Sequence, residues 1–198
     1  MSAPAVDGVI LAAGLSSRME RPKPLLNVGA MTFLERAMTT LRAAGCRRTY
    51  VVVNATDGVT ADHARELGAE TVLNDDPESA PLDSLRLVLQ RLPEDTGAVV
   101  VLPVDLPLIA EDTVTAIVRS FRENPGRLIL PFHNGVAGHP VLIGRDVFDD
   151  VLTRPLEEGL RSLIMESART LREVKVIDPG ILIDIDTPDD YWRFIENK

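Results

Sequence analysis

The sequence has only one cysteine, Cys46, so no disulfide can form within the chain. A chain without disulfides suits a reducing compartment, and we expect the cytoplasm. Cys46 follows Gly45 at the end of an apparent helix, with no histidine close by in the sequence. We therefore interpret Cys46 as a buried structural thiol rather than as a nucleophile.

Positive charge is scarce: 21 lysines and arginines stand against 30 aspartates and glutamates, and the formal net charge is −9. Binding of nucleic acid needs a basic surface, so we expect no nucleic-acid partner. The same charge disfavours anionic ligands in general. A phosphate site on this chain must therefore be locally basic or must hold a metal ion.

Long apolar runs are also missing. None approaches the length needed to cross a bilayer, and residues 1–7 lack the basic region and apolar core of a secretory signal, so we expect no membrane partner and no signal peptide. Neither of the two common glycine-rich phosphate-binding motifs, G-x-G-x-x-G and G-x-x-x-x-G-K-[ST], is present. Hydrophobic residues nevertheless make up 45% of the 198 positions, which suffices for a single domain, 1–198, with a substantial core.

Apolar runs of strand length alternate along the chain with segments of helical periodicity. Strands are predicted at 6–11, 50–54, 70–73, 98–102, 127–132, 140–143, 171–177 and 181–186, and helices at 31–44, 61–67, 82–92, 111–123, 148–152, 160–168 and from 188 onwards. Thr60 and Thr187 are the predicted caps of two of these helices. The alternation predicts an α/β fold, a three-layer α/β/α sandwich around a mostly parallel sheet.

The segment 11–26 is the most distinctive stretch of the chain. It follows the first predicted strand and is rich in small residues, whose backbone N–H groups can approach an anion closely. Arg18 then supplies a planar cation and Lys23 a point charge. We interpret the segment as a polyphosphate cradle, whose candidate nucleotide-binding residues are Leu11, Ala12, Ala13, Gly14, Arg18 and Lys23.

Carboxylates follow two of the later apolar runs. Asp105 comes shortly after the run of valines at 99–101, and Asp184 and Asp186 alternate, so that they would share one face of a strand. Two carboxylates on one face repel each other unless a cation or a donor lies between them. Asp105 could equally be a turn residue, and Asp184 could face water. Because ligands of parallel sheets bind beyond the carboxyl ends of the strands, we expect Arg18, Lys23, Asp105 and the segment 74–84 to gather at one edge.

The run L-A-A-G-x-S-x-R-M at 11–19, followed by P-K-P-L-L at 22–26, resembles the opening signature of nucleotidyltransferases with a Rossmann-like, sugar-nucleotide-transferase type of fold. It is most similar to that of the molybdenum cofactor cytidylyltransferases and guanylyltransferases. The resemblance implies a catalytic role for Lys23, Arg18 and Asp105. Asp105-Leu106-Pro107 matches the D-x-P pattern of the family, whose aspartate binds Mg²⁺, and Asp186 matches the residue that completes this metal site.

Further roles follow only from the resemblance. Asn74 and Ser84 match positions that contact the base and ribose of the nucleotide, although Ser84 could be only a helix-start residue. His139, in the G-x-P element 138–140, matches a position beside the acceptor substrate, although a lone histidine could also be structural. Two places depart from the family pattern: Glu20 stands where relatives have glycine, and Ala80-Pro81-Leu82-Asp83 stands where they have glycine and a serine-rich turn.

The resemblance implies an Mg²⁺-dependent enzyme that transfers a nucleoside monophosphate from an NTP to a phosphate-bearing acceptor and releases pyrophosphate. CTP is favoured over GTP by the L-A-A-G form of the signature, and molybdopterin is the expected acceptor. A molybdoenzyme or its chaperone is a further expected contact, and the oligomeric state is left open. Two alternatives are transfer to a sugar phosphate, polyol phosphate or phospho-acid, and a nucleotide-binding protein without turnover, which Glu20 and the segment 80–83 would favour.

Overall fold

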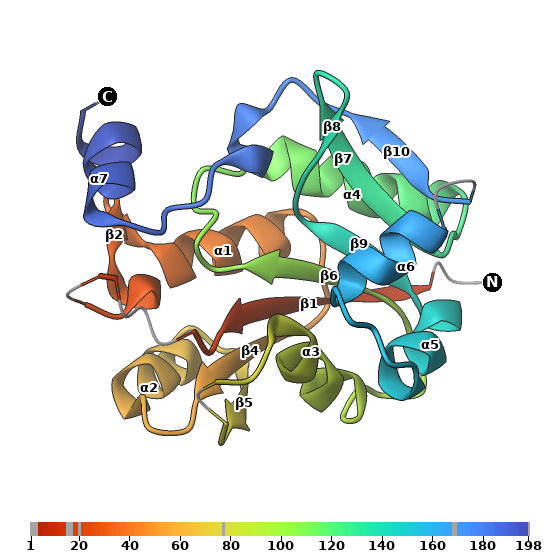
Figure 1. Cartoon of the computed structure of the whole chain (residues 1–198), viewed down its shortest axis with the longest axis horizontal. Coiled ribbons are helices and arrows are strands. Elements are labelled where there is room, and N and C mark those ends of the chain that lie inside the picture. The colour runs from red at the N-terminus through yellow and green to blue at the C-terminus, as the bar shows by residue number, and fades with distance from the viewer. Residues whose placement is uncertain (1–3, 15–17, 20, 77, 168–169, 198) are drawn as a thin grey trace.

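The strand β1 (Ala5–Ala12) has parallel partners on both sides in the main sheet (Figure 1). The computed structural model describes residues 4–14, 18–19, 21–76, 78–167 and 170–197. In this part of the chain, the further strands of the main sheet are β4 (Thr49–Asn54), β5 (Glu70–Asn74), β6 (Thr96–Pro103), β7 (Leu128–His133), β8 (Val136–Ala137), β9 (Val141–Gly144) and β10 (Arg172–Lys175). The ribbon β2 (Asn27–Val28) and β3 (Met31–Thr32) is separate.

The strand order is β10-β7-β9-β6-β1-β4-β5, with β8 paired to β7. The pairs of β1 with β4 and β6, of β4 with β5 and of β7 with β10 are parallel, whereas β9 runs antiparallel to β6 and β7. The predicted mostly parallel sheet is thus confirmed. In Figure 1, β1 and β6 both run toward the side of the molecule where β2 and α7 (Pro188–Tyr191) lie.

Helices cover both faces of the sheet. The helices α1 (Phe33–Ala43), α2 (Gly58–Glu66) and α4 (Glu111–Glu123) pack on one face, and α3 (Pro81–Leu89), α5 (Phe148–Thr153) and α6 (Leu160–Glu166) pack on the other. Shorter helical segments are η1 (Lys23–Leu25), η2 (Arg145–Val147), η3 (Pro179–Leu182) and the π-helix η4 (Trp192–Glu196), which continues α7. The predicted three-layer α/β/α sandwich is confirmed.

Period-two alternation distributes the strand side chains between two hydrophobic cores. Val6 and Ile10 of β1 belong to the core under α1 and α4, whereas Val9 belongs to the core under α3 and α5. Successive side chains of a strand point to opposite faces, so a continuous apolar run can fill both cores at once.

Three predictions about local structure were wrong. The segment 181–186 is not a strand. Its first two residues complete the 3₁₀ turn η3, at whose start Asp178 Oδ1 accepts a hydrogen bond from Gly180 N (2.9 Å), and residues 183–186 form neither helix nor strand. Thr60 does not cap α2; Asp57 does, with its Oδ1 accepting from Thr60 N at 3.0 Å. The third helix ends at Leu89 rather than at residue 92. The predicted cap at Thr187 is confirmed.

The amino-terminal half of β1 contains a fully buried carboxylate that the sequence analysis missed. The side chain of Asp7 is 0% exposed and accepts from Arg47 Nε (3.2 Å), Arg47 Nη2 (3.1 Å), Arg48 N (3.2 Å) and Thr96 Oγ1 (2.7 Å). Arg47 also pairs with exposed Asp95 (2.6 Å), and these hydrogen bonds, to Asp95 first and then to Asp7, raise the pKa of Arg47. The network ties the start of β1 to β6 and to the chain before β4.

Cys46 lies between α1 and β4 and packs partly against the hydrophobic core. Burial, with a further contribution from the negative charge of Asp7, raises the pKa of its thiol to about 12. The thiol is therefore protonated at neutral pH and is a poor nucleophile, which agrees with the structural role expected for it. Among the described residues, none of the helices combines the length and apolarity that a bilayer crossing requires.

Replacing the buried carboxylate should destabilise the fold. We expect Asp7→Ala to lower the free energy of unfolding by about 3 kcal/mol, because Thr96 Oγ1 and the Arg48 N–H lose their buried acceptor. Urea unfolding followed by circular dichroism measures the loss. Asp95→Ala removes the exposed partner of the same arginine and should cost much less; equal losses for the two variants would contradict the role given to burial.

Alkylation of Cys46 should be slow in the folded protein. Because each pKa unit changes the thiolate fraction tenfold, labelling by iodoacetamide near pH 8 should be at least about a hundredfold slower than in the urea-unfolded chain. Mass spectrometry of timed samples gives both rates. Equal rates would show that the thiol is neither buried nor raised in pKa.

Candidate active site

The carboxyl ends of β1 and β6 are joined by a backbone hydrogen bond from Val104 N to Leu11 O (3.1 Å). A small hollow of about 80 Å³ lies at this junction, and it is lined by Leu11, Ala12, Gly14, Lys23, Pro24, Val104 and Asp105. Five of the predicted site residues therefore meet at one place. Ala13 packs instead against the core on the α3 side, and Glu20 lies outside the described residues.

Two cations and two carboxylates from three distant segments converge beside this hollow. Lys23 Nζ donates to Asp186 Oδ1 and lies 3.5 Å from Asp105 Oδ2. Arg18 Nη2 donates to Asp186 Oδ2 at 2.9 Å. The side chain of Lys23 is only 12% exposed, whereas those of Asp105 and Asp186 are 30% and 35% exposed. The predicted gathering of Arg18, Lys23 and Asp105 at one edge is thus confirmed, and Asp186 lies with them.

The local charges shift the pKa values of two carboxyl groups in opposite directions. The hydrogen bond from Lys23, with help from the charge of Arg18, lowers the pKa of Asp186. Burial and the negative charges of Asp105 and Asp186 raise the pKa of Asp184. The cluster therefore favours the ionised form of Asp186, whereas the surroundings of Asp184 disfavour its ionised form.

The segment that carries Asp184 and Asp186 is held in place by backbone contacts. Ile185 N donates to Asp105 O (2.8 Å), and His139 N donates to Ile181 O (3.1 Å). A Cβ atom on Gly138 would come within 2.4 Å of the same carbonyl oxygen, so only glycine allows this approach. The G-x-P element thus has a packing role, which the sequence analysis did not anticipate.

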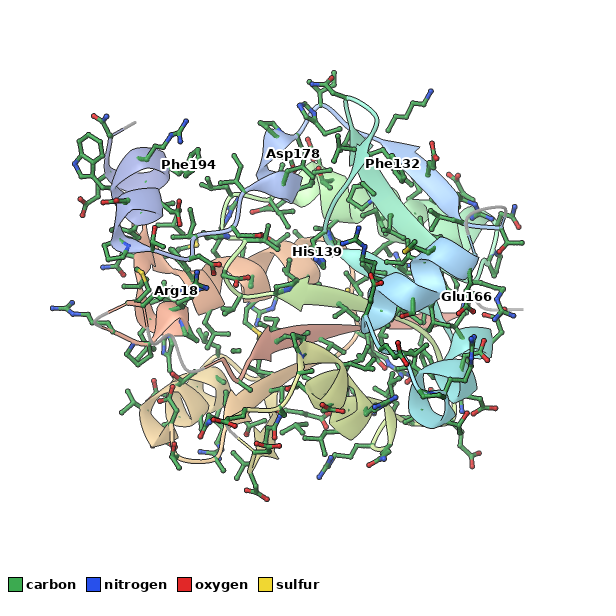
Figure 2. The ribbon with its side chains drawn as sticks, viewed as in Figure 1. Arg18, Phe132, His139, Glu166, Asp178 and Phe194 are labelled. Atoms are coloured by element: carbon green, nitrogen blue, oxygen red, sulfur yellow. The ribbon has the colours of Figure 1, made fainter. Side chains whose placement is uncertain are left out.

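Asp178 is a second residue that the sequence analysis missed. Its Oδ2 accepts from Ala110 N (2.9 Å) and Thr113 Oγ1 (2.7 Å) at the start of α4, and its Oδ1 accepts from Gly180 N. One side chain therefore ties α4 to the turn that precedes Asp184; Figure 2 labels it. The Asp-Pro-Gly sequence at 178–180, a common turn composition, was the available signal.

The donor set fits a small divalent cation. The Lys23 ammonium contacts Asp105 and Asp186 together and so marks a point where one positive ion can be held by both carboxylates. The described residues form no cluster of three or more His, Cys, Asp or Glu suited to a metal. Two carboxylates, with phosphate oxygens and waters completing an octahedron, is the arrangement that Mg²⁺ adopts in nucleotide sites.

A larger cleft of about 580 Å³ adjoins the small hollow, and Leu11 and Asp105 line both. It is lined on one side by residues 80–82 at the start of α3. Further lining residues are 157–161 and Ile164, which lie just before α6 and in its first part, together with His139 and Asp184. His139 Nδ1 is buried without a hydrogen-bond partner among the described residues, and burial lowers the pKa of the ring. In Figure 2, Arg18 lies at the edge toward which β1 runs and His139 lies near the middle of the view.

Asn74 and Ser84 lie apart from this arrangement. Both are buried, and Asn74 Nδ2 donates to Ser84 Oγ (2.9 Å) and to Ser79 Oγ (2.6 Å). Of the segment 74–84 that was expected at this edge, residues 80–82 line the larger cleft, whereas Asn74 and Ser84 line neither that cleft nor the small hollow. In this structure they brace the loop between β5 and α3, and contact with a nucleotide stays a prediction for both.

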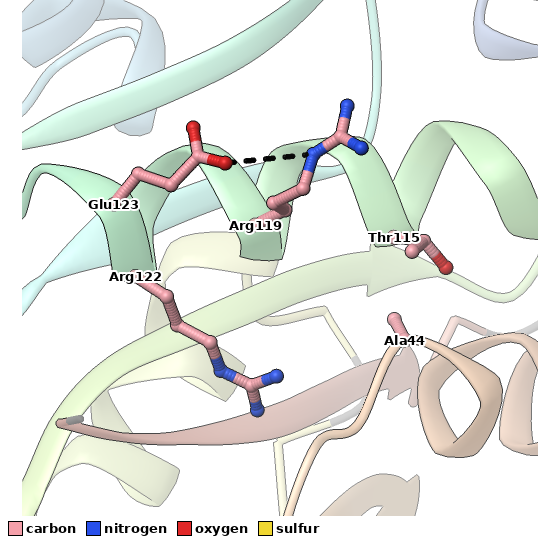
Figure 3. A pocket seen from close by; sticks show the side chains of 5 residues that line it. All are labelled: Ala44, Thr115, Arg119, Arg122 and Glu123. Carbon is pink, nitrogen blue, oxygen red and sulfur yellow. Dashed lines mark ion pairs between the residues drawn. The ribbon is translucent and has the colours of Figure 1, made fainter. Parts of the chain in front are cut away.

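A third hollow lies on the α4 side of the molecule and has a structural explanation. It is lined by Ala44, Thr115, Arg119, Arg122 and Glu123 (Figure 3). Arg122 Nη2 donates to Gly45 O (2.7 Å) at the end of α1, and Arg119 pairs with Glu123 at 3.9 Å. Arg122 thus joins α4 to the end of α1, and Arg119 is paired within α4 itself.

Comparison with known proteins identifies related chains. Residues 8–171 match the family model described as MobA-like NTP transferase domain. The molybdenum cofactor cytidylyltransferase of Escherichia coli K12 is 28% identical over 187 residues, 94% of either chain. A protein of Rhodopirellula baltica, named "Probable molybdenum cofactor guanylyltransferase", is also 28% identical, over 94% of this chain and 90% of its own.

Solved structures of related proteins are similar to this chain along nearly its whole length. Rv0371c from Mycobacterium tuberculosis H37Rv superimposes with a TM-score of 0.83 at 28% identity and covers 99% of this chain and 100% of its own. Its complex with manganese gives a TM-score of 0.77 at 26% identity over 98% and 100% of the two chains. The fold is thus of the Rossmann-like nucleotidyltransferase type, and with the family model matching most of its length, this chain belongs to the nucleotidyltransferases with a MobA-like NTP transferase domain.

Proposed function

We propose that this protein transfers CMP from CTP to a phosphate-bearing acceptor, molybdopterin in the first place, and releases pyrophosphate. The observation that carries the proposal is the position of Asp105. It borders both the hollow beside the segment 11–14 and the larger cleft, and it shares the Lys23 ammonium with Asp186. A group held at this point would lie between two neighbouring substrates.

The two spaces suit the two substrates. The small hollow, with Gly14 and Lys23 in its lining, is where we place the phosphates of the NTP, because unhindered backbone and a cation favour an anion there. The cleft of about 580 Å³ is where we place the acceptor, since its size suits a small organic molecule. His139 would face the acceptor there.

The reaction itself is a substitution at phosphorus. An oxygen of the acceptor phosphate attacks the α-phosphorus, the bond from that phosphorus to the bridging oxygen breaks, and pyrophosphate leaves with the electron pair. A phosphate nucleophile is already ionised at neutral pH, so no general base is required. The task left to the protein is to position the substrates and to neutralise charge.

Each charged residue has a part in this proposal. Lys23 and Arg18 offset the negative charge that grows on the leaving pyrophosphate. Asp105 and Asp186 would hold Mg²⁺, which supplies polarisation of the α-phosphate when bound. The manganese complex of Rv0371c supports a divalent ion in this type of fold.

The nucleotide choice is tested directly by pyrophosphate release. With Mg²⁺ and molybdopterin present, we expect release from CTP to exceed release from GTP, and we expect little release from either NTP without an acceptor. Faster release with GTP would overturn the choice of base. Release only with a sugar phosphate, polyol phosphate or phospho-acid would overturn the acceptor, and tight binding of Mg²⁺-NTP with no release for any acceptor would favour a binding protein without turnover.

Removal of either central charge should abolish most of the activity. We expect Asp105→Asn and Lys23→Met each to lower kcat by at least about a hundredfold, because each removes a group that acts on charge developing in the transition state. The control is Asp189→Asn, an exposed carboxylate three residues after Asp186, which should change kcat by less than about twofold. Turnover of Asp105→Asn at the rate of the unaltered protein would refute the metal assignment.

A further inference from the structure

Lys23 occupies the place between the two carboxylates where the divalent cation is proposed to bind. Its ammonium contacts Asp186 Oδ1 and Asp105 Oδ2, and its side chain is 12% exposed. An ammonium ion and a divalent cation seek the same carboxylate oxygens. The two therefore compete for one position rather than occupying neighbouring ones.

The four charges joined by ion pairs in the resting cluster balance one another. The positive charges of Lys23 and Arg18 meet the negative charges of Asp105 and Asp186 through ion pairs. A divalent ion added while the ammonium stays would place like charges a few ångströms apart, beside a lysine side chain that is mostly buried, where Coulomb repulsion is stronger than in water. Binding of the metal alone is thus opposed.

The triphosphate changes this balance, because it brings several negative charges to the same hollow. Lys23 lines that hollow as well, together with Gly14 and Ala12. Its backbone is held by η1, where Leu26 N donates to Lys23 O (3.0 Å) and Pro24 is buried, so only the flexible side chain has to move. The ammonium can pass from carboxylate to phosphate without any rearrangement of the fold.

We propose that Lys23 is the resident counter-ion of the metal site, and that the nucleotide draws its ammonium away and so opens Asp105 Oδ2 and Asp186 Oδ1 to the divalent cation. This inference rests on the proposed function. It makes metal and nucleotide binding mutually dependent: each ligand binds weakly alone and strongly with the other. In the absence of nucleotide, the same ion pairs neutralise two carboxylates whose negative charges would repel an incoming triphosphate.

The test measures binding of Mn²⁺ and of CTP separately, so it does not depend on turnover. Free Mn²⁺ is counted by electron paramagnetic resonance, with and without CTP, for the unaltered chain and for Lys23→Met. Arg21→Met is the matched control, since it removes one positive charge from the same loop at an exposed position that faces Tyr191 and Glu196. The melting temperature checks the fold, and Lys23→Gln replaces the methionine variant if that variant does not fold.

We expect Lys23→Met to bind Mn²⁺ without nucleotide at least about tenfold more tightly than the unaltered chain, and to bind CTP more weakly. Opposite shifts for the two ligands are a result that simple damage to the site cannot give. The enhancement of Mn²⁺ affinity by CTP, expected at about 5- to 150-fold in the unaltered chain, should shrink in this variant. Arg21→Met should leave both affinities within about twofold.

Mn²⁺ affinity in Lys23→Met no tighter than in Arg21→Met would overturn the inference. Asp105→Asn separates this failure from a failure of the proposed function. If Asp105→Asn abolishes Mn²⁺ binding while Lys23→Met fails to strengthen it, the metal assignment stands and only the exchange is wrong. If Asp105→Asn leaves Mn²⁺ binding unchanged, the metal assignment itself is wrong, and the exchange falls with it.

Discussion

The ion pairs from Lys23 to Asp105 and Asp186 are the interaction on which the candidate site depends. They join the loop after β1, the end of β6 and the chain before α7. In a chain of net charge −9, an anionic substrate needs a place where positive charge is concentrated, from basic side chains or a metal ion. The two carboxylates hold Lys23 and Arg18 at that place. The same ion pairs therefore position the cations and neutralise the negative charges of the carboxylates.

The main sheet fixes the position of the central carboxylate, Asp105. β1 and β6 are parallel neighbours, and the backbone bonds from Val104 N to Leu11 O and from Ile185 N to Asp105 O extend this pairing past the strand ends. Asp105 therefore has a position fixed on both sides by main chain. This is why a carboxylate at a strand end can serve a site whose other members come from residues far away in the sequence.

How much of this could be predicted from the sequence depended on the range of the interactions involved. Strands such as 98–102 are fixed by local composition, and the edge where Arg18, Lys23 and Asp105 meet follows from the rule for parallel sheets. Segment 181–186 was mispredicted because its apolar alternation is typical of a strand. In the structure its first two residues end η3, which Asp178 caps, and residues 183–186 form neither helix nor strand. The packing of Gly138 against Ile181 O also lay beyond sequence reasoning, because it joins residues that are neighbours only in the folded chain.

The two ends of β1 show how exposure separates a permanent ion pair from an exchangeable one. At the amino end, Asp7 is 0% exposed and has four donors from three residues, so removing Arg47 would leave a buried carboxylate without its counter-ion. At the carboxyl end, Asp105 and Asp186 are about a third exposed, and water can solvate them while a partner changes. Similar chemistry thus gives a fixed link in the core and, at the site, the contact that a triphosphate and a divalent ion would replace in the exchange we propose.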